Sequence, residues 1–132
     1  MTDCVTLTFR RGVLEHILAL RPKLALYTKV AQMGEKTSRY SPDNEVRGVG
    51  YQSGGMPLSG GKVEEIKDGL VLSFDDVQWP NATITARWAL IYLADDAGRA
   101  IRVIDFGKDV TSTNGPFTVL LPAAGDGGVI LI

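Results

Sequence analysis

The residues after Pro22 form short runs rich in β-branched and aromatic side chains, separated by turn-forming residues. Lys67-Asp68-Gly69 lies between two of these runs, and Asp-Gly in such a place is a strong hairpin signal. Turns are also expected at 95–98, 114–116 and 123–128, and strands at 23–28, 62–66, 70–74, 82–93, 99–106, 117–122 and 129–132. Strands at this spacing predict a mainly β fold, either an antiparallel β-sandwich or a small jelly-roll-like barrel.

Before Pro22 the apolar residues follow a helical period instead. Between Thr8 and Leu20 they recur at steps of three and four, which places them on one face of a helix. Thr6 or Thr8 is expected to cap the start, and Pro22 ends the helix because it forces Arg21 out of helical geometry. We therefore divide the single folding unit into an N-terminal arm and helix, 1–22, and a β-sandwich domain, 23–132.

Length and charge exclude several classes of protein. A chain of 132 residues is long enough for one core and too short for two domains. Its 14 basic and 15 acidic residues give a net charge of -1, which argues against a nucleic-acid partner. No apolar run approaches the ~20 residues that span a bilayer, and the first residues do not resemble a secretory signal. We expect synthesis in a cytoplasm and no membrane partner, and the single cysteine excludes an internal disulfide.

The four residues Val129 to Ile132 are all apolar. Such a segment left as a free tail would be an exposed edge prone to aggregation. We expect it to be paired, with its own sheet favoured over a neighbouring subunit.

The stretch 45–61 holds six glycines and only three large side chains, those of Tyr51, Met56 and Leu58. It does not fit a phosphate-binding loop, which needs a Gly-Lys-Ser/Thr ending that opens a helix. A dinucleotide fingerprint is also excluded, because Pro57 and a predicted strand follow where a helix is required. We interpret the stretch as a shaped contact loop, with Tyr51 packing it onto the sandwich.

Catalytic and metal-binding chemistry has few candidates. His16 and Cys4 are the only residues of their types, so neither a zinc site nor a well-held nucleophile is expected from them. The doublets Asp75-Asp76 and Asp95-Asp96 suit a cation site such as one for calcium, but aspartate at strand ends more often serves as a turn or cap residue. We predict no enzyme, no cofactor and no catalytic metal.

Three segments, taken in order, resemble a family of small virion proteins of tailed bacteriophages and prophages. They are "EVRGVGYQSGG" (45–55), "LSFDDVQWPNATITARWALIY" (72–92) and "VIDFGKDVTSTNGPFTVLLP" (103–122), and the likeness extends from Lys23 to Pro122. One departure is Trp88, which stands where the family pattern has a glycine. We expect this added indole to be buried in a pocket or at a contact.

The resemblance implies a structural role in the virion, with the major capsid protein and further copies of the chain as partners. The first hypothesis is a capsid decoration, or cement, protein; the second is a tail fibre, baseplate or head-to-tail adaptor component. A more remote alternative is a carbohydrate-binding module or small hydrolase with an aromatic platform of Tyr51, Trp79 and Trp88, although both tryptophans are first expected in the core. The residues predicted to contact other subunits are Phe9, Val13, Ile17, Gly48, Gly50, Tyr51, Gly54, Gly55 and Trp88.

Overall fold

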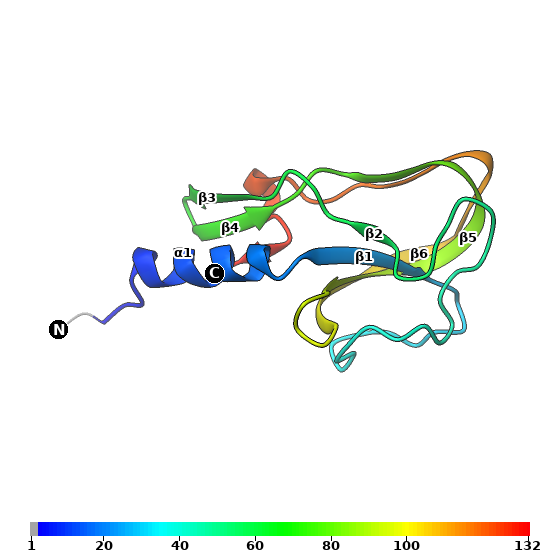
Figure 1. The fold of residues 1–132 in the computed structure, drawn as a ribbon. Helices are drawn as coiled ribbons and strands as arrows, with labels where there is room; N and C mark the ends of the chain where they lie inside the picture. The colour runs from blue at the N-terminus through cyan, green and yellow to red at the C-terminus, as the bar shows by residue number, and fades with distance from the viewer. Residues whose placement is uncertain (1–2) are drawn as a thin grey trace.

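The computed structural model describes residues 3–132, which form two antiparallel sheets and one α-helix (Figure 1). One sheet has the strand order β2-β1-β5-β6 and the other β3-β4-β7. The predicted antiparallel sandwich with one N-terminal helix is confirmed, and within the described residues both sheets are open. The elements are α1 (Leu7–Ala19), β1 (Pro22–Tyr27), β2 (Met56–Pro57), β3 (Lys62–Ile66), β4 (Gly69–Ser73), β5 (Val77–Leu93), β6 (Arg99–Val119), the 3-10 helix η1 (Ala124–Asp126) and β7 (Ile130–Leu131).

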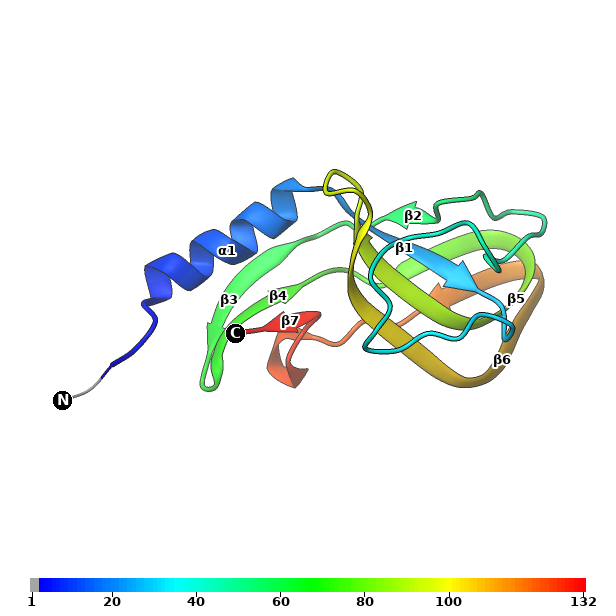
Figure 2. The ribbon, with the colours of Figure 1, turned by 90° about the horizontal axis from the view of Figure 1, so that it is seen from below.

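The helix begins and ends where the sequence predicts. Thr6 is the cap of the two proposed, since its Oγ1 accepts a hydrogen bond from the Phe9 N–H at 3.2 Å. Leu14 is fully buried, and Ile17 and Leu18 pack against the same core. Figure 2 shows α1 lying beside β3, with its first turn and the preceding arm extending away from the body. Between residues 3 and 132 no helix is long and apolar enough to cross a bilayer.

Strands β5 and β6 form one long ribbon that bends back on itself (Figure 1). The predicted break at 114–116 is wrong, because β6 runs without interruption from Arg99 to Val119. β-Bulges explain the difference: the register shifts between Trp79 and Ala82, and a bulge holds extra residues within a ladder while bending it. β5 also begins at Val77, earlier than the expected residue 82.

The main core fills the space inside the bent ribbon. Trp79 near the start of β5 and Phe117 near the end of β6 lie opposite one another in the ribbon. Their ring centroids are 6.3 Å apart in an edge arrangement. They share one cluster with Leu24 of β1 and Ile91 from the returning half of β5. The outer face of β1 and β5 carries a second cluster, which the segment 28–45 covers with Ala31 and partly buried Met33 and Tyr40.

The smaller sheet is completed by the end of the chain. Ile130 and Leu131 pair with β4, and the Leu70 N–H donates to the Ile132 carbonyl at 2.8 Å. The preferred prediction of pairing within the chain's own sheet is therefore confirmed. The Asp-Gly hairpin is confirmed as well, because Ile66 lies opposite Gly69 in the register of β3 and β4.

Candidate functional site

The segment 45–55, which we call the motif loop, is organised around the buried carboxylate of Glu45. Oε1 accepts hydrogen bonds from the Tyr40 hydroxyl at 2.6 Å and the Ser53 hydroxyl at 2.9 Å. Oε2 accepts from the Tyr51 hydroxyl at 2.6 Å and the Gly54 N–H at 2.8 Å. Each carboxylate oxygen has about two lone-pair sites, so these donors occupy the whole acceptor capacity of the group. The Glu45 cluster, as we call these five residues, is a structural clamp in which donors from the chain itself occupy the acceptor sites of the carboxylate.

The clamp also joins the motif loop to the main sheet. The Leu26 N–H of β1 donates to the Tyr51 hydroxyl at 2.9 Å, and that hydroxyl in turn donates to Glu45. Two backbone hydrogen bonds of 2.9 Å extend the attachment, from Val46 N–H to the Leu26 carbonyl and from Thr83 N–H to the Val49 carbonyl. The expectation that Tyr51 packs the loop onto the sandwich is confirmed, and the loop is an ordered extension of the sheet.

Two glycines let the motif loop approach the sheet closely. Gly50 has φ +86°, and a Cβ there would lie 2.1 Å from the Asn81 carbonyl oxygen. Gly55 has φ +78°, and its Cβ would lie 1.9 Å from the Leu24 carbonyl oxygen. Any other residue would meet the backbone of β5 or β1 at these points. The glycines therefore serve the packing of the loop within the chain itself.

The residues predicted to contact other subunits fall into two groups. Tyr51 is 9% exposed and Ile17 is partly buried against the core, so the structure gives both side chains contacts within the chain, and their partner role stays a prediction. Phe9 and Val13 are exposed, 65% and 36% respectively. For Gly48 and Gly54 the partner role stays a prediction, although a Cβ at Gly48 would meet the Thr83 carbonyl oxygen and the Gly54 N–H belongs to the Glu45 cluster.

Burial of the tyrosine rings raises the pKa of all four tyrosines. The pKa of Tyr92 is raised to about 12, and those of Tyr27, Tyr40 and Tyr51 are also raised. Desolvation is the main cause, and the Glu45 carboxylate adds to it by hydrogen bonding to Tyr40 and Tyr51. Tyr40 and Tyr92 stack with 4.7 Å between ring centroids, so the four phenols belong to one region around Glu45.

These raised pKa values predict unfolding at alkaline pH. The folded state holds its phenol protons more tightly than the unfolded state, where tyrosine ionises near pH ~10. The stabilisation is therefore complete below that pH and is lost as pH rises through the folded pKa values, with Tyr92 at about 12. We expect tyrosinate absorbance to appear together with loss of near-ultraviolet circular dichroism, well above its onset in denaturant. Ionisation of two or more tyrosines near pH ~10 in the folded protein would contradict this expectation.

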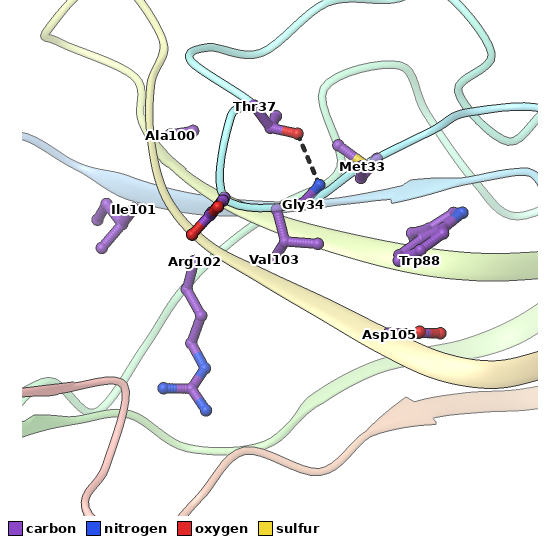
Figure 3. Close-up of a pocket in the computed structure, with 10 residues that line it drawn as sticks. Met33, Gly34, Thr37, Trp88, Ala100, Ile101, Arg102, Val103 and Asp105 are labelled. Atoms are coloured by element: carbon purple, nitrogen blue, oxygen red, sulfur yellow. Dashed lines mark hydrogen bonds between the residues drawn. The ribbon is translucent and has the colours of Figure 1, made fainter.

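Trp88 lies at a groove between the loop 33–37 and β6. The groove has a volume of about 590 Å³, and Figure 3 shows Met33 next to the indole, with Val103 and Asp105 along β6. The Arg87 guanidinium lies 4.7 Å from the Trp88 ring centroid and pairs with Asp105 at 2.9 Å. The Trp88 Nε1 atom is buried and has no acceptor among the described residues. The Trp88 indole thus lines a hollow and is partly buried, whereas burial in a pocket or at a contact was expected.

The other chemical candidates are not brought together. Cys4 and His16 are both exposed, and about nine helical residues, or roughly 14 Å, separate the start of α1 from His16. Asp76 accepts a hydrogen bond from the Leu121 N–H at 2.7 Å, as a turn residue does. The Asp95 carboxylate accepts from Arg21 Nε at 2.8 Å, which lowers the pKa of Asp95, and Asp96 pairs with Arg99 at 2.7 Å.

The aromatic platform considered for carbohydrate binding is not formed. Tyr51 and Trp79 pack in the core with 5.6 Å between ring centroids and are 9% and 3% exposed. Trp88 lies instead with the cluster on the other face of the sheet. Among known protein families, curated proteins and solved structures, no match to this chain is found.

Proposed function

We propose that this chain is a non-enzymatic structural protein of a tailed-bacteriophage virion, and that it acts as a decoration protein on the major capsid shell. The sequence resemblance over Lys23 to Pro122 supplies the class of protein. The motif loop, which carries part of that resemblance, supports a scaffold role, because the Glu45 carboxylate has all of its acceptor sites filled by the loop and Tyr40.

The observation that carries the proposal is a set of exposed apolar side chains at one end of the molecule. We call it the apolar row because Phe9 and Val13 lie one turn apart on the same side of α1. The arm and the first turn of α1 extend away from the sheets (Figures 1 and 2). Several apolar side chains of the arm and of the first two turns are exposed. Exposed apolar surface of this kind on a small protein marks a contact with another protein. The row consists of Val5, Leu7, Phe9 and Val13, with exposed fractions of 58%, 42%, 65% and 36%.

A decoration protein binds as many copies across a repeating surface, so modest individual contacts are sufficient. Burying one phenylalanine side chain contributes about 1.5–3 kcal/mol, and simultaneous contacts with neighbouring shell subunits add to a strong attachment. A second apolar contact lies on the motif loop, where Val49 is 74% exposed between two glycines that hold its backbone against β5.

A tail fibre, baseplate or head-to-tail adaptor component is the second candidate. The first turn of α1 and the arm before it extend beyond the body and favour this candidate, because a projecting apolar segment suits insertion into a neighbouring ring. Quantitative mass spectrometry of purified particles separates the two by copy number. Hundreds of copies per particle are expected for a shell protein and about a dozen or fewer for most tail parts. Absence of the chain from purified particles would contradict both.

Changing Phe9 and Val13 to serine tests the apolar row directly. Both side chains are exposed, so the double variant should keep its melting temperature within a few degrees of the wild type, since surface changes alter stability by about 0.5 kcal/mol each or less. Incorporation into particles should fall at least tenfold in a competition with wild-type protein. Leu120→Ser is the matched control, because Leu120 is 75% exposed at a site outside α1. Unfolding of the double variant, or normal incorporation, would show that the row has no assembly role.

A further inference from the structure

The Trp88 groove runs along an edge strand. β6 is the last strand of its sheet, and the backbone of Ser38 to Tyr40 pairs with it only at its start, through Arg39 opposite Arg99 and the Ala100 N–H to the Ser38 carbonyl. The loop then leaves β6, so the groove continues along residues 101–105 where no described strand lies beside the edge. An edge strand within a groove is the usual seat of an added peptide strand.

Two further features of the groove also suit a peptide main chain. The Trp88 Nε1–H is buried without an acceptor, and such a donor costs about 1–3 kcal/mol until a carbonyl or water meets it. Met33, Trp88 and Val103 form an apolar side to the groove, where one side chain of an extended segment finds cover (Figure 3). A main-chain carbonyl and an adjacent apolar side chain together satisfy both features.

We infer that this groove takes the N-terminal arm, residues 3–6, of a second copy of the chain as an added β-strand. The arm has the required chemistry: Thr6 is in an extended conformation, and Val5 is a β-branched residue that is 58% exposed on its own subunit. The inference goes beyond the proposed role on a particle, because it concerns assembly of the protein in solution.

The arm of the same molecule is too distant to fill the groove. The 13 residues of α1 span about 20 Å, and the carbonyl of its C-cap residue, Leu20, accepts from the Asp95 N–H in the turn before β6. The four described arm residues reach at most about 14 Å and leave the helix at its opposite end (Figures 1 and 2). Copies joined in this way would connect head to tail.

Charge complementarity sets the direction of the added strand. Arg39 and Arg99 lie directly opposite one another at the near end of the groove, and of the two only Arg99 has an ion-pair partner among residues 3–132. Asp3 is the one charged side chain of the described arm. A parallel register that places Val5 beside Val103 places Asp3 toward this arginine pair. An antiparallel arrangement in the same position would direct Asp3 toward Asp105 instead.

Disulfide trapping tests this arrangement in the full-length protein. Cys4, the only cysteine, lies in the arm and is exposed, and in the parallel register it falls beside Arg102, on the face of the added strand opposite to Val5. Arg102→Cys therefore places a thiol next to it on β6. Isotopically heavy and light protein are mixed and oxidised mildly, and cross-linked peptides are identified by mass spectrometry. We expect heavy–light disulfides between Cys4 and the thiol introduced by Arg102→Cys. Their yield should be at least tenfold above that of the matched control Leu120→Cys, which replaces a side chain 75% exposed outside the groove.

Two additional variants test whether trapping depends on the arm. Val5→Asp removes the apolar side chain from the arm and should reduce trapping of Cys4 in the groove to the control level, whereas Glu64→Asp, an exposed change outside both surfaces, should leave it unchanged. Equal trapping at positions 102 and 120, no effect of Val5→Asp, or disulfides within single chains only would overturn the inference. Trp88-dependent binding of a sugar that is indifferent to Val5→Asp would assign the groove to a different ligand. Because no particle is used, failure here leaves the proposed virion role standing, and absence from particles leaves arm exchange standing.

Discussion

Replacing Glu45 by alanine is expected to lower the free energy of unfolding by about 3–5 kcal/mol, because each buried donor left without an acceptor costs about 1–3 kcal/mol. The reason is that the hydroxyls of Tyr40, Tyr51 and Ser53 and the Gly54 N–H lose their common acceptor. For a domain of this size, such a loss lowers the melting temperature by about 12–20 °C. Thermal and urea unfolding followed by circular dichroism measure the effect.

Two variants identify the network as the cause. Glu65→Ala removes an exposed glutamate from β3 and should change stability by about 0.5 kcal/mol or less. Glu45→Gln keeps the shape of the side chain but replaces one carboxylate oxygen by an NH2 group. That group can only donate, so it faces two hydrogen-bond donors of the loop without accepting from them, and the loss of stability should be intermediate. A loss below about 1 kcal/mol for Glu45→Ala would mean that water replaces the carboxylate without cost.

Gly55→Ala is expected to destabilise the protein by about 2–5 kcal/mol. A positive φ costs a non-glycine residue about 1–2 kcal/mol, and the new methyl group would also meet the Leu24 carbonyl oxygen, at 1.9 Å in the present geometry. Relief of that contact requires the motif loop to move away from β1. The hydrogen bonds of the Glu45 cluster would then lengthen as well.

Gly107 provides a matched control for this substitution. It has the same φ of +78°, but a Cβ at Gly107 meets nothing within 4 Å. Gly107→Ala should therefore show only the backbone penalty, about 1–2 kcal/mol. Urea unfolding of the two variants side by side isolates the cost of close approach, and equal losses would show that the motif loop yields easily to an added methyl group.

The fold is predicted best where a local rule acts alone. The helix is delimited by its apolar period and Pro22, and the β3–β4 hairpin by its Asp-Gly turn. The rule fails at Asn114-Gly115-Pro116, which carries a turn signal yet lies within β6. There the ladder with β5 and the packing of Phe117 on Trp79 outweigh the local preference, and a bulge with Asn114 at φ +47° accommodates the conflict.

The Glu45 cluster could not be predicted in the same way. Three of its donors lie six to nine residues after Glu45 along an irregular loop, and the fourth, Tyr40, precedes it, so they follow neither a helical nor a strand period. The glycines indicated a shaped loop, but not that it approaches the chain's own β1 and β5. The apolar stripe of α1 was predicted to include Ile17, whose burial depends on where the smaller sheet lies.

The closing of the smaller sheet has a consequence for the order in which the protein folds. The ribbon of β5 and β6 joins neighbouring segments, whereas β4 waits for residues 130–131, and Arg10 contacts the Ile132 carbonyl 122 positions away. Contacts between such distant segments form late because a large loop must close first. On the ribosome, one backbone edge of β4 must therefore stay unpaired while β5 and β6 are synthesised. The nascent chain is most prone to aggregation during this period.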